Sequence, residues 1–270
     1  MALIILTSLF LLGIGPSLAA DLHDHAAWDA FLKKYVNEAG EVQYQAVADN
    51  PDDLNAYLDE LASVNNMSLG RDWTREEKLA LYLNAYHAGV IRLIIEHWPV
   101  ETIQEIPGVW DLPAVRIGKE SHSLNHLRSQ DLIGAFRDEK IHLALACGAK
   151  GCPRLRKEAY SAMRVEGQLF LATQEFVNDP NRTIIYTGAK KIELSRIFKW
   201  YGSDFRLDFA GPDDETQFSV TETAVLSFIA HYLQEADKID FLSRRKYKIK
   251  YLPFEWTLNE WVSDSGAIAR

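Results

Sequence analysis

The two cysteines of the chain lie close together, in the stretch IHLALACGAKGCP at residues 141–153. The stretch also carries His142. A cysteine thiolate is a nucleophile and a nearby histidine is a base, so Cys152 and His142 could form a nucleophilic pair. Cys152 directly precedes Pro153, and proline is common at the first position of a helix. We therefore expect Cys152 at a helix N-cap, where the backbone N–H groups would favour the thiolate and could stabilise an oxyanion.

The same residues permit other chemistry. Cys147 and Cys152 could form a disulfide across the short glycine-containing loop, as cysteines do in oxidising compartments. They could also remain inert buried thiols. A zinc site from His142 and the two cysteines is a further alternative. The sequence has no C-x-x-C pair and no H-E-x-x-H motif, so we expect no metal and no cofactor.

Two further side chains could orient the imidazole of His142, as the third member of a catalytic triad does. Asn84 lies in an apolar helical pattern and Asp204 in the aromatic stretch SRIFKWYGSDF. The alternatives are structural: Asn84 could bond a loop carbonyl, and Asp204 could cap a turn in a packed corner. The aromatic stretch itself is either a packed corner or a substrate wall. We expect His122 and His126 on the surface.

The elements that must position these residues follow from periodicity and turn signals. We predict a long central helix that begins at the Thr74–Glu77 capping box and ends before Pro99. The stretch 141–147 alternates like a strand and would place His142 opposite Cys147. Further helices are predicted at residues 29–36, 53–61, 124–136, 155–177 and 220–233, and strands at 115–117, 183–186, 191–194 and 246–251. The expected fold class is α+β: a helix-rich single domain with a small antiparallel sheet.

Composition limits the function classes. The 270 residues are 47% hydrophobic and 25% charged, as in a soluble globular protein. The net charge of −9 repels phosphate, so we expect no nucleic-acid partner and no binding to anionic lipid.

The first twenty residues predict export. Residues 1–20 carry no charged side chain, residues 3–14 are almost continuously apolar, and small residues follow Gly15 and Pro16. This is typical of a cleaved secretory signal peptide, and the apolar run is short for a membrane span of roughly 20 residues. An uncleaved anchor is the alternative. We expect a mature chain that is soluble after signal cleavage, in the periplasm or outside the cell.

Four blocks of the sequence resemble the DUF547 domain, a family of unknown function: residues 81–100, 141–155, 194–205 and 251–261. The resemblance implies a permuted papain-like core related to thiol hydrolases. Carried over residue by residue, the motif histidine matches His142, the motif cysteines match Cys147 and Cys152, the helix asparagine matches Asn84 and the aspartate matches Asp204.

The chain departs from the family pattern in two places. The pattern S-L-x-x-I-E-H becomes Leu127-Arg128-Ser129 at its end, and the serine before the second cysteine is Gly151. If the missing Glu-His pair belongs to a site, this chain is a non-catalytic relative. The expected domain plan is a signal peptide at 1–20, a helical segment at 21–72 that packs on the core, a DUF547-like domain at 73–261, whose extent the resemblance implies, and a tail at 262–270.

Two functions follow. The first is an exported thiol hydrolase of amide or peptide bonds, with Cys152 as nucleophile, His142 as base, and Asn84 or Asp204 as the orienting group. Its substrate would be a peptide, an amide or a glycopeptide. The second is a non-catalytic envelope protein that binds such a molecule or a protein ligand, with Cys147 and Cys152 held in a disulfide.

Overall fold

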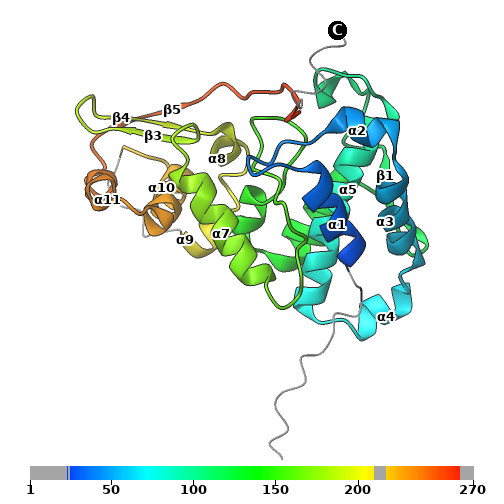
Figure 1. Ribbon diagram of the computed structural model, residues 1–270. Coiled ribbons are helices and arrows are strands. Elements are labelled where there is room, and N and C mark those ends of the chain that lie inside the picture. Colours follow the sequence, from blue (N-terminus) through cyan, green and yellow to red (C-terminus); the bar gives the residue numbers. More distant parts are fainter. Residues whose placement is uncertain (1–22, 24, 210–216, 262–270) are drawn as a thin grey trace, which may run out of the picture.

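The computed structural model describes residue 23, residues 25–209 and residues 217–261 (Figure 1). The predicted signal peptide at 1–20 and the tail at 262–270 lie outside the described residues. Within the described ranges, no helix is both long enough and apolar enough to cross a bilayer.

Helices dominate the described residues, and short strands accompany them, so the predicted α+β class is confirmed. The α-helices are α1 (Ala26–Tyr35), α2 (Tyr44–Asp49), α3 (Asp52–Ser63), α4 (Asn66–Arg71), α5 (Arg75–Glu96), α6 (Leu124–His126), α7 (Val165–Asn178), α8 (Arg196–Trp200), α9 (Arg206–Phe209), α10 (Val220–Tyr232) and α11 (Ala236–Ser243). The 3₁₀-helices are η1 (Ile103–Glu105) and η3 (Glu139–Leu143), and η2 (Leu127–Gly134) is a π-helix. The strands are β1 (Pro113–Ile117), β2 (Glu120–Ser123), β3 (Thr183–Tyr186), β4 (Lys191–Leu194) and β5 (Lys248–Tyr251).

Helix α5 is the central element, as its sequence predicts. Its capping box is present in full: the Thr74 side chain accepts from the Glu77 N–H, and the Glu77 carboxylate accepts from the Thr74 N–H. The helix is buried on most of its circumference, which explains why its apolar residues are not confined to one face.

The strands form two small sheets. β1 and β2 pair as an antiparallel hairpin, and β3 and β4 pair antiparallel in a three-stranded sheet. β5 joins that sheet beside β4 in parallel, because the long chain segment between them returns through α8 to α11. In Figure 1 this sheet lies with α8, α10 and α11 on one side of the molecule, and α1 to α5 lie on the other.

Two hydrophobic cores correspond to these two sides. The N-terminal core is built around Trp28, Tyr57 and the buried apolar residues of α5, and the C-terminal core around Phe198, Phe205 and Phe228. The segment that carries the site lies between them, since Ile141 belongs to the first core and Leu143 to the second.

The prediction of a strand at 141–147 is wrong. The structure has η3 over Glu139–Leu143, where Asp138 caps the turn by accepting from the Lys140 N–H, and an irregular segment after it. Residues 141–146 are all buried, so the segment has no exposed face of the kind that a half-buried strand would show. A short buried apolar run cannot be assigned to a strand by periodicity alone.

The helix predicted at 155–177 begins later, at Val165, and residues 153–164 are irregular. Side chains from other elements hold this backbone: Asp29 accepts from the Ala159 N–H, and Asn84 accepts from the Tyr160 N–H. Cys152 therefore does not lie at a helix N-cap, and the predicted activation of its thiol by a helix start is wrong.

A strap formed by residues 252–261 runs along the cysteine-containing loop. Backbone hydrogen bonds join Lys150 N to Thr257 O and Gly151 N to Glu255 O, each at 2.8 Å, and Asn259 N to Gly148 O at 3.1 Å. A Cβ at position 151 would lie 2.8 Å from the Glu255 carbonyl oxygen. The strap therefore leaves no room for a side chain at position 151.

We expect Gly148→Ala to destabilise the fold by about 1–3 kcal/mol. Gly148 has a φ of +81°, and a Cβ there would lie 2.7 Å from Ile94 Cδ1. Urea unfolding measures the change in the free energy of unfolding.

Gly167→Ala is the matched control. Position 167 lies in α7, and nothing lies within 4 Å of the added Cβ, so this change should be neutral or stabilise by up to about 1 kcal/mol. Equal effects at positions 148 and 167 would contradict the steric argument.

Candidate functional site

The clearest polar interaction at the site joins His142 to Asp204. Nε2 of His142 lies 2.8 Å from Oδ2 of Asp204. η3 supplies the histidine and the turn after α8 supplies the aspartate. The His142 side chain is 1% exposed and that of Asp204 is 37% exposed, so the pair runs from the interior to the surface.

The chemistry of the pair fixes the proton positions. Burial lowers the pKa of His142 below its ordinary value, although the hydrogen bond to Asp204 opposes the effect. The same hydrogen bond lowers the pKa of the Asp204 carboxyl. Near neutral pH the carboxylate is therefore ionised and accepts from Nε2–H, and the imidazole is neutral. Nδ1 then carries a lone pair, and it is buried without a hydrogen-bond partner among the described residues. This is the state required of a general base.

Aromatic stacking holds the imidazole in place. The ring of Tyr201 lies parallel to that of His142, with centroids 4.2 Å apart and 7° between the planes. The Arg128 guanidinium covers Tyr201 at 5.1 Å. The stack leaves the imidazole little freedom to turn away from Asp204.

His142 lines a cavity of about 200 Å³ whose wall is largely aromatic. Cys147 lines the same cavity, and Cys152 does not. The other lining residues are Tyr86, Trp110, Leu124, Asn125, Arg128, Leu145, Pro153, Ile197, Trp200, Tyr201, Phe254 and Trp256. The predicted substrate wall in the aromatic stretch corresponds to Trp200 and Tyr201, whereas Phe198 and Phe205 pack in the C-terminal core.

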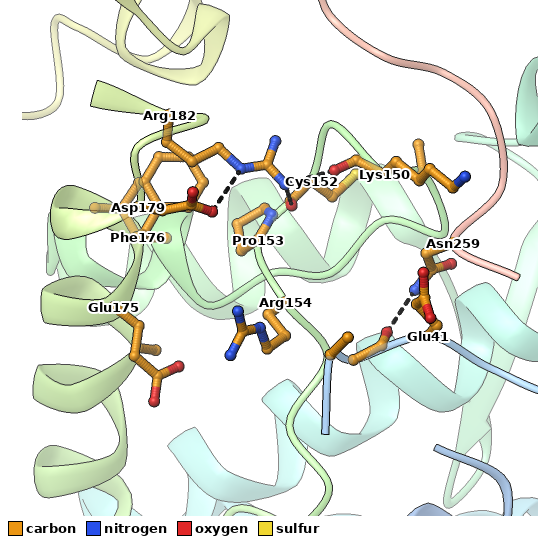
Figure 2. Close-up of a pocket in the computed structure, with 15 residues that line it drawn as sticks. Glu41, Lys150, Cys152, Pro153, Arg154, Glu175, Phe176, Asp179, Arg182 and Asn259 are labelled. Atoms are coloured by element: carbon orange, nitrogen blue, oxygen red, sulfur yellow. Dashed lines mark hydrogen bonds and ion pairs between the residues drawn. The ribbon is translucent and has the colours of Figure 1, made fainter. Parts of the chain in front are cut away.

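The two cysteines form a disulfide, with their Cα atoms 5.7 Å apart. They face different surroundings. Cys147 is half-buried beside His142's cavity. Cys152 is 2% exposed and lines a second cavity of about 180 Å³, which Figure 2 shows.

Arg182 fixes the loop between the cysteines. Its guanidinium donates to the carbonyl oxygens of Lys150, Gly151 and Cys152, and it pairs with Asp179 at 3.6 Å. Figure 2 shows this side chain next to the Cys152 backbone. Three carbonyls bonded to one half-buried cation restrict the positions that either sulfur can take.

Asn84 is not a partner of His142 in this arrangement. Its amide donates to the Tyr160 carbonyl oxygen at 2.8 Å and accepts from the Tyr160 N–H at 3.0 Å. This is the structural alternative for Asn84, and it holds the irregular segment 153–164 against α5.

His87 contacts the backbone directly before Cys147. Its Nε2 accepts from the Ala146 N–H at 3.2 Å, directly before Cys147, and lies 3.1 Å from the Ala144 carbonyl oxygen. Burial lowers the pKa of His87 to about 4. The residue is therefore a neutral structural element near neutral pH.

Sequence reasoning did not identify some of the residues that line the cavity. Trp110, Phe254 and Trp256 meet His142 from distant parts of the chain, and only the motif YLPFEWTLNEW marked the last two. The prediction that His122 lies on the surface is wrong: the side chain is buried and bonds Asp131, because β2 turns it inward. His126 is exposed as predicted.

Comparison with known protein families gives a match over part of the chain. Residues 70–177 match the family described as "Protein of unknown function, DUF547". The resemblance drawn from the motifs is thereby confirmed over those residues. No curated protein and no solved structure matched the chain. The relation to papain-like hydrolases and the predicted boundary at residues 72 and 73 stay predictions.

We expect stability to fall on acidification between pH 6.5 and about 4, in part through His87. The unfolded chain binds a proton near 6.5 and the folded chain only near 4, so stability is full above 6.5 and is lost as the pH falls. The loss from this residue is at most about 3 kcal/mol. Urea unfolding across this range measures it.

His87→Gln keeps an acceptor for the Ala146 N–H but does not titrate, so its stability should depend less steeply on pH. His231→Gln removes an exposed histidine and should keep the wild-type dependence. An unchanged slope in His87→Gln would show that His87 does not cause the loss.

Proposed function

We propose that the protein is an exported thiol hydrolase that cleaves an amide or peptide bond in the aromatic cavity. One observation carries the proposal: a buried, neutral imidazole, oriented by Asp204, has an unpartnered Nδ1 and lines the same cavity as a cysteine. A nucleophile, a base and an orienting carboxylate are the three groups that such a hydrolase needs.

Cys147 is the better candidate for the nucleophile, although the sequence, with Pro153 directly after Cys152, favours Cys152. Cys147 borders the cavity with His142, and Cys152 is buried toward the cavity on the other side of the loop. The helix that follows Cys152 begins only at Val165, so a helix start does not favour the Cys152 thiolate. In this proposal Cys152 is the partner that protects Cys147 in the oxidised protein.

The reaction starts with reduction of the disulfide. An external dithiol exchanges with Cys147–Cys152 and leaves as a disulfide, which frees both thiols. His142 Nδ1 takes the proton of Cys147, and the thiolate attacks the carbonyl carbon of the substrate. The tetrahedral intermediate collapses, the imidazolium protonates the leaving amine, and a thioester remains. Water, deprotonated by His142, hydrolyses the thioester and restores the thiol.

The proposed location is the periplasm or the extracellular space. The apolar segment at 1–20 supports export, and an oxidising compartment suits a Cys147–Cys152 disulfide. The soluble mature chain would meet peptide, amide or glycopeptide substrates there.

Thiol labelling tests the proposal. We expect Cys152→Ser to expose a Cys147 thiol that reacts rapidly with iodoacetamide, and we expect His142→Asn to lower that rate by at least about tenfold. Mass spectrometry measures labelling, and it should also find the untreated wild type two hydrogens lighter than the reduced protein.

Cys147→Ser is the matched variant, in which the buried Cys152 should react slowly. Faster labelling of Cys152 than of Cys147 would assign the nucleophile to Cys152. Labelling that is independent of His142 would contradict the base role and the hydrolase proposal with it.

The second candidate function is binding without catalysis. Its support is the aromatic wall, together with Arg128 at the position where the family pattern has glutamate. Three tryptophans line the cavity and could stack on sugar or peptide rings.

For this second function we expect glycopeptide fragments to bind the oxidised protein and to change its tryptophan fluorescence. Trp256→Ala should weaken binding by at least about tenfold, the loss typical of an aromatic anchor. Phe170→Ala removes an exposed aromatic side chain elsewhere and should leave binding intact. Binding that survives Trp256→Ala would exclude this cavity as the binding site.

A further inference from the structure

We propose that His122, His126 and Asp131 form a binding site for a divalent transition-metal ion, with Zn²⁺ as the ion that suits the ligands best. The site is separate from the cysteines and does not depend on the proposed hydrolase activity. The three residues each offer one ligand atom, and these atoms all lie within 4.8 Å of one another.

The distances are close to those of a metal site. Nδ1 of His122 lies 2.8 Å from one Asp131 carboxylate oxygen, and Nε2 of His126 lies 3.6 Å from the other. Two zinc bonds of about 2.0–2.1 Å at a tetrahedral angle separate their donor atoms by about 3.4 Å. The side chain of His126 is 52% exposed, so it is free to turn the short distance that coordination requires.

The ligand types determine the class of ion. Two imidazoles and one carboxylate suit Zn²⁺ and its neighbours among the first-row metals, whereas Ca²⁺ and Mg²⁺ prefer all-oxygen sites. Three protein ligands leave a fourth position for water or another ligand.

Burial favours an ion at this place. The side chains of His122 and Asp131 are 7% and 16% exposed. Among the described residues, Asp131 pairs with the two imidazoles rather than with a lysine or an arginine, and a histidine is cationic only when protonated. A divalent cation would neutralise the half-buried carboxylate without protonating either histidine.

The local fold explains how the three ligands meet. His122 lies in β2, His126 ends α6 and Asp131 lies in the π-helix η2, so one short strand-to-helix turn supplies them all. π-helical turns are rare and frequent at functional sites. η2 also carries Arg128, which lines the aromatic cavity, and a bound ion would therefore fix the element that presents Arg128.

Titration of the oxidised, full mature chain with Zn²⁺ tests the site, because the disulfide removes both cysteines as ligands. Calorimetry near neutral pH should give one ion per chain. Saturating Zn²⁺ should raise the thermal midpoint by roughly 5 °C. Co²⁺ in place of Zn²⁺ should give the visible absorption of a low-coordinate site.

The variants separate this site from adventitious binding. His126→Gln and Asp131→Asn should each weaken Zn²⁺ binding by at least about tenfold. His231→Gln, a change of one exposed histidine, should leave it unchanged, and so should His23→Gln, which tests the histidines near the start of the described chain. His126 is exposed, so its loss should not unfold the protein.

Absence of stoichiometric Zn²⁺ binding in the wild type would overturn the proposal, and so would full binding in both His126→Gln and Asp131→Asn. Loss of binding in His231→Gln or His23→Gln would move the site elsewhere and overturn it too. The readout is metal binding rather than hydrolysis, so failure of the thiol proposal leaves it unaffected.

Discussion

The hydrogen bond between His142 and Asp204 is the interaction on which the site depends. It joins two chain segments 62 residues apart, and it sets the tautomer of a histidine that lies between the two hydrophobic cores. A buried imidazole with no partner on either nitrogen would be costly, and one ionised carboxylate settles the proton on Nε2. Tyr201 can stack on the ring because that orientation is fixed. The bond thereby fixes one residue of the cavity wall.

The two cysteines of the disulfide line different cavities. The loop between them is held from one side by Arg182 and from the other by the strap, so its backbone is nearly fully bonded. A loop held in this way keeps one sulfur toward His142's cavity and buries the other. The disulfide therefore lies between two cavities, and its reduction would free a thiol in the cavity that His142 lines.

Sequence reasoning predicted the elements whose signals are local. The Thr74–Glu77 capping box and the strand pair at 183–186 and 191–194 are encoded by a few adjacent residues, and both are present. His142 and Asp204 were each marked as site candidates by their motifs. The sequence offered both Asn84 and Asp204 as partners of His142 and could not choose between them, because the choice depends on where the turn after α8 lies relative to η3, which no local pattern encodes.

The failures have a common cause. The buried stretch 141–147 alternates like a strand only because two cores cover it from opposite sides. Pro153 follows Cys152 as it would at a helix start, but side chains from Asp29 and Asn84 bind the next segment in an irregular form. In both places tertiary contacts outweigh local preference, as is common near functional sites.

The strap has a consequence for how the cavity forms during synthesis of the chain. The family match ends at residue 177, yet Asp204, Phe254 and Trp256 all contribute to the cavity or its histidine. During synthesis from the N-terminus, the ribosome releases residues 252–261 about a hundred residues after His142 and the two cysteines. A nascent chain that already carries both cysteines and His142 therefore still lacks the part of the cavity wall that Phe254 and Trp256 form.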